Sequence, residues 1–219
     1  MTSRPKHAEP RPAPRLYLMT PRLADTGSFA EPLAGALAVA DVAAVLLRLA
    51  NADEGTLIKR AKALAPLVQD HGAALLIDRR PGLVARARAD GAHVAGLAEF
   101  GEAIEALKPN WIVGAGGLAT RHDAMLAAEQ AADYVMFGEP DENGARPAFA
   151  AVEERVAWWA EVFEAPCVGY AAGPGDVAPL VKAGADFVAL GDWLWAEADA
   201  VTSILATAAR DLRLSEAAA

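Results

Sequence analysis

Short apolar runs alternate with longer amphipathic stretches along most of the chain. The runs are continuously apolar, as is typical of parallel strands that are buried on both faces. In the stretches between them, apolar positions recur at helical spacing. The pattern predicts strands over Leu16–Thr20, Val42–Arg48, Ala73–Asp78, Gly91–Ala95, Trp111–Gly114, Tyr134–Gly138, Pro166–Tyr170 and Phe187–Gly191. It predicts helices over Ser28–Ala40, Asp53–His71, Gly82–Ala89, Glu99–Leu107, Arg121–Ala131, Phe149–Phe163, Asp176–Ala183 and Trp193–Arg210.

The alternation of strands and helices predicts an α/β fold, a (β/α)₈ TIM barrel. Neighbouring parallel strands need a crossover connection, which the intervening helices supply. An Ala-Asp pair precedes three of the strands, at Ala89-Asp90, Ala132-Asp133 and Ala185-Asp186, as expected of a repeated unit. Periodicity alone does not show that the sheet closes, so a doubly wound open sheet is the alternative.

The length of 219 residues suits a single barrel domain, which we place at residues 16–212. Residues 1–15 contain prolines and basic residues without an apolar segment, so they predict a disordered arm rather than a secretory signal. The sole cysteine, Cys167, excludes an internal disulfide and is expected to be a buried strand residue.

The net charge of −9 restricts the partners of the protein. Such a charge opposes binding to nucleic acid or to anionic membrane surfaces, and no apolar run is long enough to span a membrane. We therefore expect a cytoplasmic protein whose partner is a small-molecule ligand. Phosphate remains an acceptable ligand, because backbone amides and helix N-termini can bind it locally.

Ligands of TIM barrels bind at the C-terminal ends of the strands. Arg48 ends the second predicted strand, where its guanidinium could bind a phosphate or pair with Asp78. Asp78 ends the third strand and could hold Mg²⁺, cap a helix or pair with Arg79. Glu99 is the candidate for a second metal ligand, although it could simply lie in the first turn of its helix.

Glycine-rich segments at the other strand ends are candidate phosphate sites. Ala172 and Gly173 precede a helix after the seventh strand, so their amides could form an anion cradle. Gly191 could approach a phosphate, whereas Asp192 would repel it unless it caps a helix. The segment from Gly114 to Gly117 leaves space for either a flat ring or a tight turn.

Two histidines and four tryptophans complete the candidates. His93 lies within a strand, as expected of a core histidine, whereas His122 in the first turn of a helix could act as a proton shuttle. The pairs Trp158-Trp159 and Trp193/Trp195 are expected in the core or at a contact between subunits of a homodimer.

In order along the chain, six of these segments resemble motifs of the thiamine phosphate synthase family, which includes the TenI-like proteins. The likeness runs from about Leu16 to Leu194. The matching segments are Leu16–Thr20, Leu75–Arg79, Ala89–Val94, Ala132–Gly138, Pro166–Gly173 and Ala183–Ala189.

The resemblance implies a TIM barrel that joins hydroxymethylpyrimidine diphosphate to a thiazole phosphate with Mg²⁺ and releases pyrophosphate. Arg48 matches a family arginine and Asp78 matches the first metal-binding aspartate. The implied phosphate-binding positions also include Gly116, Gly138 and Arg146, with Glu99 as a shifted metal ligand.

The sequence departs from the family pattern at several of these positions. Leu46, Leu49 and Ala50 replace a glutamine, a glutamate and a lysine, and Ala98 falls at the second metal aspartate. Gly116 and Asp192 stand where the family has serines, Ile77 replaces an asparagine, and the loop after Gly138 lacks the family's threonines and lysine.

These departures predict weak or absent synthase turnover and leave three functions open. The first is the synthase itself, and the second is a repurposed relative that binds a small phosphorylated or heterocyclic ligand. The third is a thiazole tautomerase that uses His122.

Overall fold

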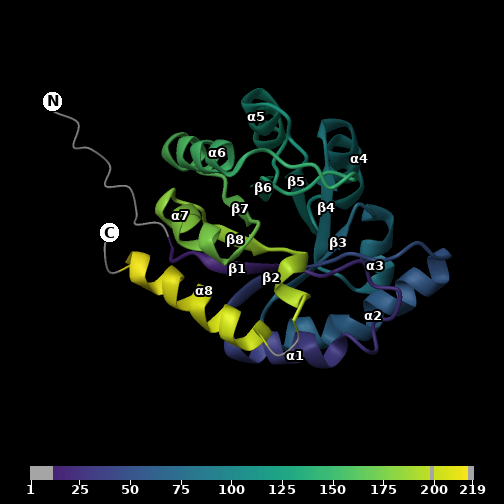
Figure 1. The fold of residues 1–219 in the computed structure, drawn as a ribbon. Helices are drawn as coiled ribbons and strands as arrows, with labels where there is room; N and C mark the ends of the chain where they lie inside the picture. The colour runs from purple at the N-terminus through teal and green to yellow at the C-terminus, as the bar shows by residue number, and fades with distance from the viewer. Residues whose placement is uncertain (1–11, 198–199, 217–219) are drawn as a thin grey trace, which may run out of the picture.

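The computed structural model describes residues 12–197 and 200–216 as a ring of parallel strands surrounded by helices (Figure 1). The strands are β1 Arg15–Met19, β2 Val42–Leu47, β3 Ala74–Asp78, β4 Gly91–Ala95, β5 Ile112–Gly116, β6 Tyr134–Phe137, β7 Cys167–Ala171 and β8 Phe187–Leu190. The α-helices are α1 Ala30–Val39, α2 Glu54–Asp70, α3 Val84–Ala87, α4 Leu97–Leu107, α5 Arg121–Glu129, α6 Phe149–Val162, α7 Val177–Lys182 and α8 Val201–Glu216. The 3₁₀ helices are η1 Pro81–Leu83, η2 Pro174–Asp176 and η3 Asp192–Trp195.

The strands form a closed barrel in sequence order, with β8 paired to β1. This closure confirms the TIM barrel and excludes the open sheet. Every predicted strand is present, with ends shifted by at most two residues. The first strand begins at Arg15, inside the predicted arm, and residues 1–11 of that arm lie outside the described residues.

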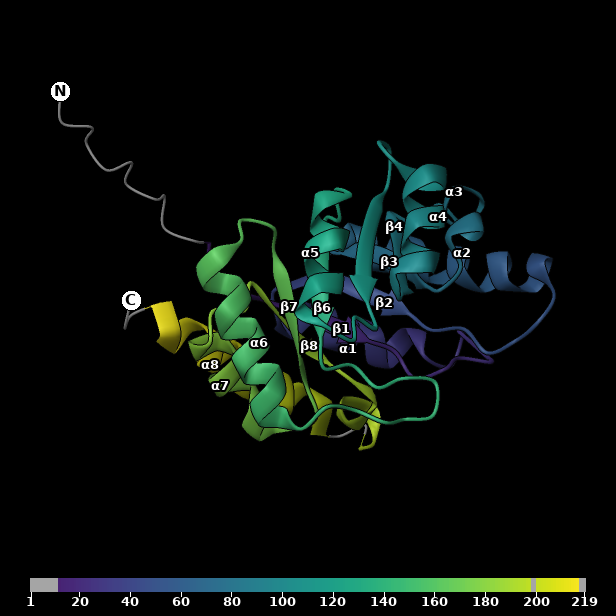
Figure 2. The ribbon, with the colours of Figure 1, turned by 90° about the horizontal axis from the view of Figure 1, so that it is seen from above.

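The last predicted helix is instead two elements, η3 and α8 (Figure 2). The indole Nε1 of Trp193 donates to the carbonyl of Ala171 at 2.8 Å, and that of Trp195 donates to the carbonyl of Met19 at 2.7 Å. These bonds tie η3 to the ends of β7 and β1 within one chain. The two tryptophans therefore have an intramolecular role, and the homodimer stays a prediction.

The core has two layers, as the continuous apolar strands predict. Inward-facing side chains, among them Tyr17, Leu76 and Tyr134, fill the barrel. Side chains on the opposite faces of the strands, including the buried Cys167, pack against the helices. None of the helices in the described ranges is long and apolar enough to cross a membrane.

The aspartates of the Ala-Asp repeats join neighbouring strands. The carboxylate of Asp90 accepts the amide of Leu75 at 2.7 Å, and the carboxylate of Asp133 accepts the amide of Val113 at 2.6 Å. The carboxylate of Asp186 accepts the amide of Cys167 at 2.8 Å. Each aspartate thus satisfies an amide at the start of the preceding strand, which explains the repeat physically.

Replacing Asp90 with alanine is expected to lower the free energy of unfolding by about 1–3 kcal/mol, because the amide of Leu75 would lose its partner. Chemical denaturation measures this change. The matched control is Asp70→Ala at the exposed end of α2, which we expect to change stability by less than about 0.5 kcal/mol. Equal effects of the two substitutions would contradict this role for Asp90.

Candidate active site at the mouth of the barrel

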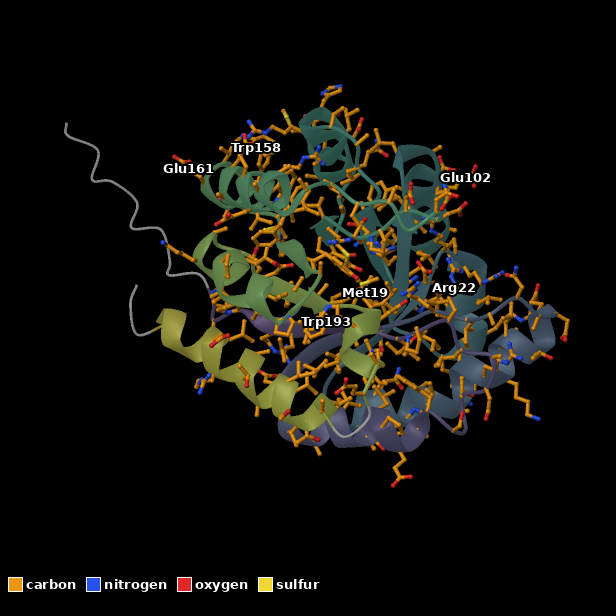
Figure 3. The ribbon with its side chains drawn as sticks, in the orientation of Figure 1. Met19, Arg22, Glu102, Trp158, Glu161 and Trp193 are labelled. Atoms are coloured by element: carbon orange, nitrogen blue, oxygen red, sulfur yellow. The ribbon has the colours of Figure 1, made fainter. Side chains whose placement is uncertain are left out.

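A cavity of about 610 Å³ opens at the C-terminal ends of the strands. Its walls come from β1 to β4, from β6, from the segment just after β5, from the loop of residues 138–148 that connects β6 to α6, and from α6 itself. Figure 3 shows Met19 near the middle of the ring of strands and Arg22 to its right, toward α2 and α3, whereas Glu102, Trp158 and Glu161 lie on the outer helices. The cavity is therefore at the mouth that the fold predicts for a ligand.

Arg48 projects into this cavity just beyond β2. Its amide donates to the hydroxyl of Thr20 at 3.0 Å, and its carbonyl accepts the amide of Leu23 at 2.9 Å. Its guanidinium forms a 2.5 Å ion pair with Asp192, and the Arg48 side chain is only 14% exposed. The backbone of Arg48 is thus held firmly, and a ligand phosphate would compete with Asp192 for its side chain.

Asp78 and Arg79 stand beside Arg48 at the end of β3. Burial raises the pKa of Asp78, although Arg48 and Arg79 act in the opposite direction. Arg79 has a left-handed backbone with φ of 53°, and its amide donates to the carbonyl of His93 at 2.7 Å. Its guanidinium pairs with Glu142 at 2.5 Å, which connects the end of β3 to the loop after β6.

The mouth is more cationic than the sequence motifs suggest. Five arginines and four carboxylates line the cavity: Arg22, Arg48, Arg79, Arg146 and Arg155, with Asp78, Glu139, Asp141 and Glu142. Sequence reasoning proposes only Arg48 and Arg146 as ligand-binding cations. Sequence reasoning treats Arg79 only as a partner of Asp78, and it passes over Arg22, which lies in the loop after β1, and Arg155, which lies on α6. The adjacency of Arg79 to Asp78 was the available signal.

A row of buried polar side chains crosses the inside of the barrel below the cavity. The His93 Nδ1 lies 3.0 Å from the hydroxyl of Tyr134, which lies 2.9 Å from the hydroxyl of Tyr17. Gly114 permits this arrangement, since a Cβ there would overlap the Tyr134 ring. Burial lowers the pKa of His93 to about 3, so its imidazole is neutral at physiological pH. His93 is the satisfied core histidine that its strand position predicts, and it also contributes to the cavity wall.

Glu139 turns inward from the start of the 138–148 loop. Its Oε1 accepts the amide of Gly117, and it lies so close to Gly116 that a Cβ at this glycine would overlap it. Burial raises the pKa of Glu139 to about 7, and the nearby negative charge of Asp78 acts in the same direction. The side chain is therefore partly protonated at neutral pH.

The stability of the protein should depend on pH through Glu139. Its pKa is about 7 in the folded state against an ordinary value of 4.5. The protonated carboxyl group therefore makes its full contribution to the free energy of unfolding below about pH 4.5. This contribution is lost as the pH rises through 7 and the buried group ionises. Because glutamine does not ionise, Glu139→Gln should raise the melting temperature more at pH 8 than at pH 5. A difference between variant and wild type that stays constant over this range would contradict the assignment.

The other predicted site residues lie in different parts of the mouth. Gly138 and Arg146 line the cavity with Arg48 and Asp78, and the Arg146 guanidinium lies 5.8 Å from the centre of the Tyr170 ring. Glu99 lines a neighbouring groove that shares Asp78 and Arg79 with the cavity. His122 is exposed in the first turn of α5 and is not part of the cavity wall, so its role in catalysis stays a prediction.

At several points the glycine-rich segments leave space for, or donate hydrogen bonds to, side chains of the protein itself. Gly116 makes room for Glu139, and Gly191 makes room for the hydroxyl of Tyr170. The amide of Ala172 donates to the Asp176 carboxylate at 2.8 Å, while the position of a Gly173 Cβ would be open space. Gly117, with φ of 59°, forms the tight turn that the glycine run allows.

Asp78 is the residue best placed to hold a metal ion. The described residues contain no group of three or more His, Cys, Asp or Glu side chains arranged to bind one. Mg²⁺ commonly takes only one or two protein carboxylates and completes its coordination with water and substrate phosphate oxygens. One carboxylate in a cavity with several arginines therefore fits Mg²⁺ that arrives with a phosphorylated ligand.

The fold and the cavity define a TIM barrel with an arginine-rich mouth suited to a phosphorylated small molecule. The family described as thiamine monophosphate synthase matches residues 16–193, and the chain belongs to this family. The thiamine-phosphate synthase of Rhodospirillum centenum is 41% identical over 184 residues, covering 83% of this chain and 89% of that protein. The thiamine-phosphate synthase of Hyphomonas neptunium is 35% identical over 205 residues, covering 88% of this chain and 90% of that protein.

A solved structure shows the same fold. The thiamine phosphate pyrophosphorylase from Pyrococcus furiosus superposes with a TM-score of 0.76 at 22% sequence identity. The match covers 92% of this chain and 96% of that one. This likeness confirms the fold, whereas the family resemblance seen in the sequence is confirmed by the family match and the two synthases above.

Proposed function

We propose that the protein is a thiamine-phosphate synthase, which joins hydroxymethylpyrimidine diphosphate to a thiazole phosphate and releases pyrophosphate. The observation that carries this proposal is the convergence of Arg48, Asp78 and Arg79 at one mouth of the barrel. The synthases of Rhodospirillum centenum and Hyphomonas neptunium support it by their similarity over most of the chain.

The reaction needs a site that stabilises a leaving diphosphate. The bond between the pyrimidine methylene carbon and the diphosphate oxygen breaks, and its electron pair leaves with pyrophosphate. The thiazole nitrogen then donates its lone pair to the methylene carbon, forming the carbon–nitrogen bond of a thiazolium without any proton transfer. Charge develops on the diphosphate, so fixed cations near it supply much of the catalysis.

The arginines of the mouth are the groups that can bind this charge. Arg48 and Arg79 would donate to the diphosphate in place of Asp192 and Glu142, their present partners. Asp78 would hold Mg²⁺, which when bound adds positive charge at the leaving group. Arg146, on the β7 side, would bind the thiazole phosphate, and the amides of the Gly173 loop are further candidates. Arg48 and Arg79 match the family pattern, so Arg146 is the arginine that replaces part of the charge lost with the family's lysines.

The inner part of the cavity suits the organic part of the substrates. Met19, Leu46 and Met136 line it with apolar atoms. Such a surface can pack against a ring and keep water away from the reactive methylene carbon. Water at that carbon would divert the reaction to a hydrolysed pyrimidine alcohol.

The test is a pyrophosphate-release assay with both substrates and Mg²⁺, compared with reactions that lack either substrate. We expect thiamine phosphate and pyrophosphate to form in equal amounts and only when both substrates are present. Binding without turnover is the second candidate function, favoured by the pairing of Asp192 with Arg48. A thermal shift with thiazole phosphate but no pyrophosphate release would support that function and refute the synthase.

A further inference from the structure

One side of the inner cavity is polar although its floor is apolar. Met19, Leu46 and Met136 form the apolar part, while Glu139 and His93 line the wall beside them. Leu46 offers no hydrogen-bonding side-chain atom where the family carries a glutamine. Hydrogen bonds to the edge of a ring in this space must therefore come from other residues.

The position of Glu139 depends on a glycine that itself departs from the family pattern. A Cβ at Gly116 would lie within 2.5 Å of the His93 Nε2 and would overlap the Glu139 Oε1. The serine that the family has at this position would displace one of these side chains. The absence of a side chain at Gly116 therefore makes room for the inward position of Glu139.

The Glu139 carboxyl group is held by the protein while it faces the cavity. The amide of Gly117 donates to its Oε1, which holds that oxygen in place and leaves Oε2 to contact a ligand. A carboxyl group accepts an N–H from an exocyclic amine, and in its protonated form it also donates to an adjacent ring nitrogen. An aminopyrimidine edge presents this pair, an amine beside a ring nitrogen.

We propose that Glu139 recognises the amine-bearing edge of the pyrimidine substrate and so determines specificity for an aminopyrimidine ring. This inference rests on the proposed function for the identity of the substrate. A purely structural role is the competing explanation, in which Glu139 only stabilises the turn at Gly117. That role would not make affinity depend on the amine of the ligand.

The experiment measures the dissociation constants of hydroxymethylpyrimidine diphosphate and of an analogue with hydrogen in place of its ring amine. Titration calorimetry with Mg²⁺ compares the full-length wild type with Glu139→Ala and Glu139→Gln. We expect the wild type to prefer the amine-bearing ligand by about 10- to 100-fold. Glu139→Ala should reduce this preference to less than about 3-fold, whereas Glu139→Gln should keep most of it because its amide carbonyl also accepts an N–H.

A matched control is Glu142→Ala, which removes another cavity carboxylate. It should change the affinity for both ligands by a similar factor and leave their ratio as in the wild type. A Glu139→Ala variant with the wild-type ratio would overturn the proposal, and so would a Glu139→Gln variant that folds but loses the preference.

The outcome is separable from that of the synthase proposal, because binding requires no turnover. A wild type that releases no pyrophosphate but shows the amine preference at Glu139 would refute the synthase and uphold this inference. A wild type that releases pyrophosphate but binds both ligands equally would uphold the synthase and refute this inference. Thermal unfolding of each variant verifies that it is folded.

Discussion

Replacing Arg48 with alanine is expected to lower the affinity for hydroxymethylpyrimidine diphosphate by about 100-fold or more. Arg48 is a largely buried cation in the cavity, its backbone is anchored by Thr20, and its side chain ends beside Asp78 and Asp192. Its removal would leave the diphosphate facing these two carboxylates. Titration calorimetry measures the affinity, and the rate of pyrophosphate release should fall with it.

The control for Arg48 removes an arginine outside the cavity. Arg86 on α3 pairs with Glu54 and its side chain is 61% exposed, so Arg86→Ala changes the net charge equally. We expect this variant to bind as the wild type does. Arg48→Lys should give an intermediate affinity, because lysine keeps the charge but loses the forked donor geometry. An Arg48→Ala variant with unchanged affinity would remove this residue from the site.

Introducing serine at Gly116 is expected to lower the free energy of unfolding by about 1–3 kcal/mol, as overpacking typically does, and to slow thiamine phosphate formation because the wall of the cavity is disturbed. The added Cβ would overlap Glu139 and His93, so one of them must move out of position. Serine is the residue of the family pattern at this position, so the variant tests whether the cavity of this protein has become incompatible with it. Steady-state kinetics and thermal unfolding measure the effect.

Two further variants separate the clash from a general effect of serine. Gly82→Ser places the same side chain where a Cβ would meet open space, and we expect it to be nearly neutral. Removing the opposing side chain as well, in Gly116→Ser/Glu139→Ala, should restore the melting temperature toward that of the wild type. No recovery in the double variant would show that the clash is not with Glu139.

The fold was largely predictable because strands that are buried on both faces appear in the sequence as continuous apolar runs. The runs at Val42–Leu47 and Ala74–Asp78 are continuously apolar up to their ends. Barrel closure was not predictable from periodicity, since it depends on the pairing of β8 with β1. The break between η3 and α8 also depends on tertiary contacts, namely the inward turn of Trp193 and Trp195.

The site was predictable only where a functional residue ends a strand. Arg48 and Asp78 could be named because a charged residue after an apolar strand must lie at the mouth. Glu139 could be placed at a strand end, but its inward turn depends on the missing side chain at Gly116. The contribution of Arg155 could not be read from the sequence either, because it reaches the mouth from α6, where its guanidinium donates to the carbonyls of Leu118 and Ala119.

A crystal structure of the protein with pyrophosphate, thiamine phosphate and Mg²⁺ tests the central claim most directly, because that claim is about where the diphosphate binds. We predict that the diphosphate will lie within hydrogen-bonding distance of the Arg48 and Arg79 guanidinium groups, beside Asp78. A diphosphate bound instead in the groove beside Glu99 or on the loop at Gly173, with both guanidinium groups still paired to Asp192 and Glu142, would contradict the account.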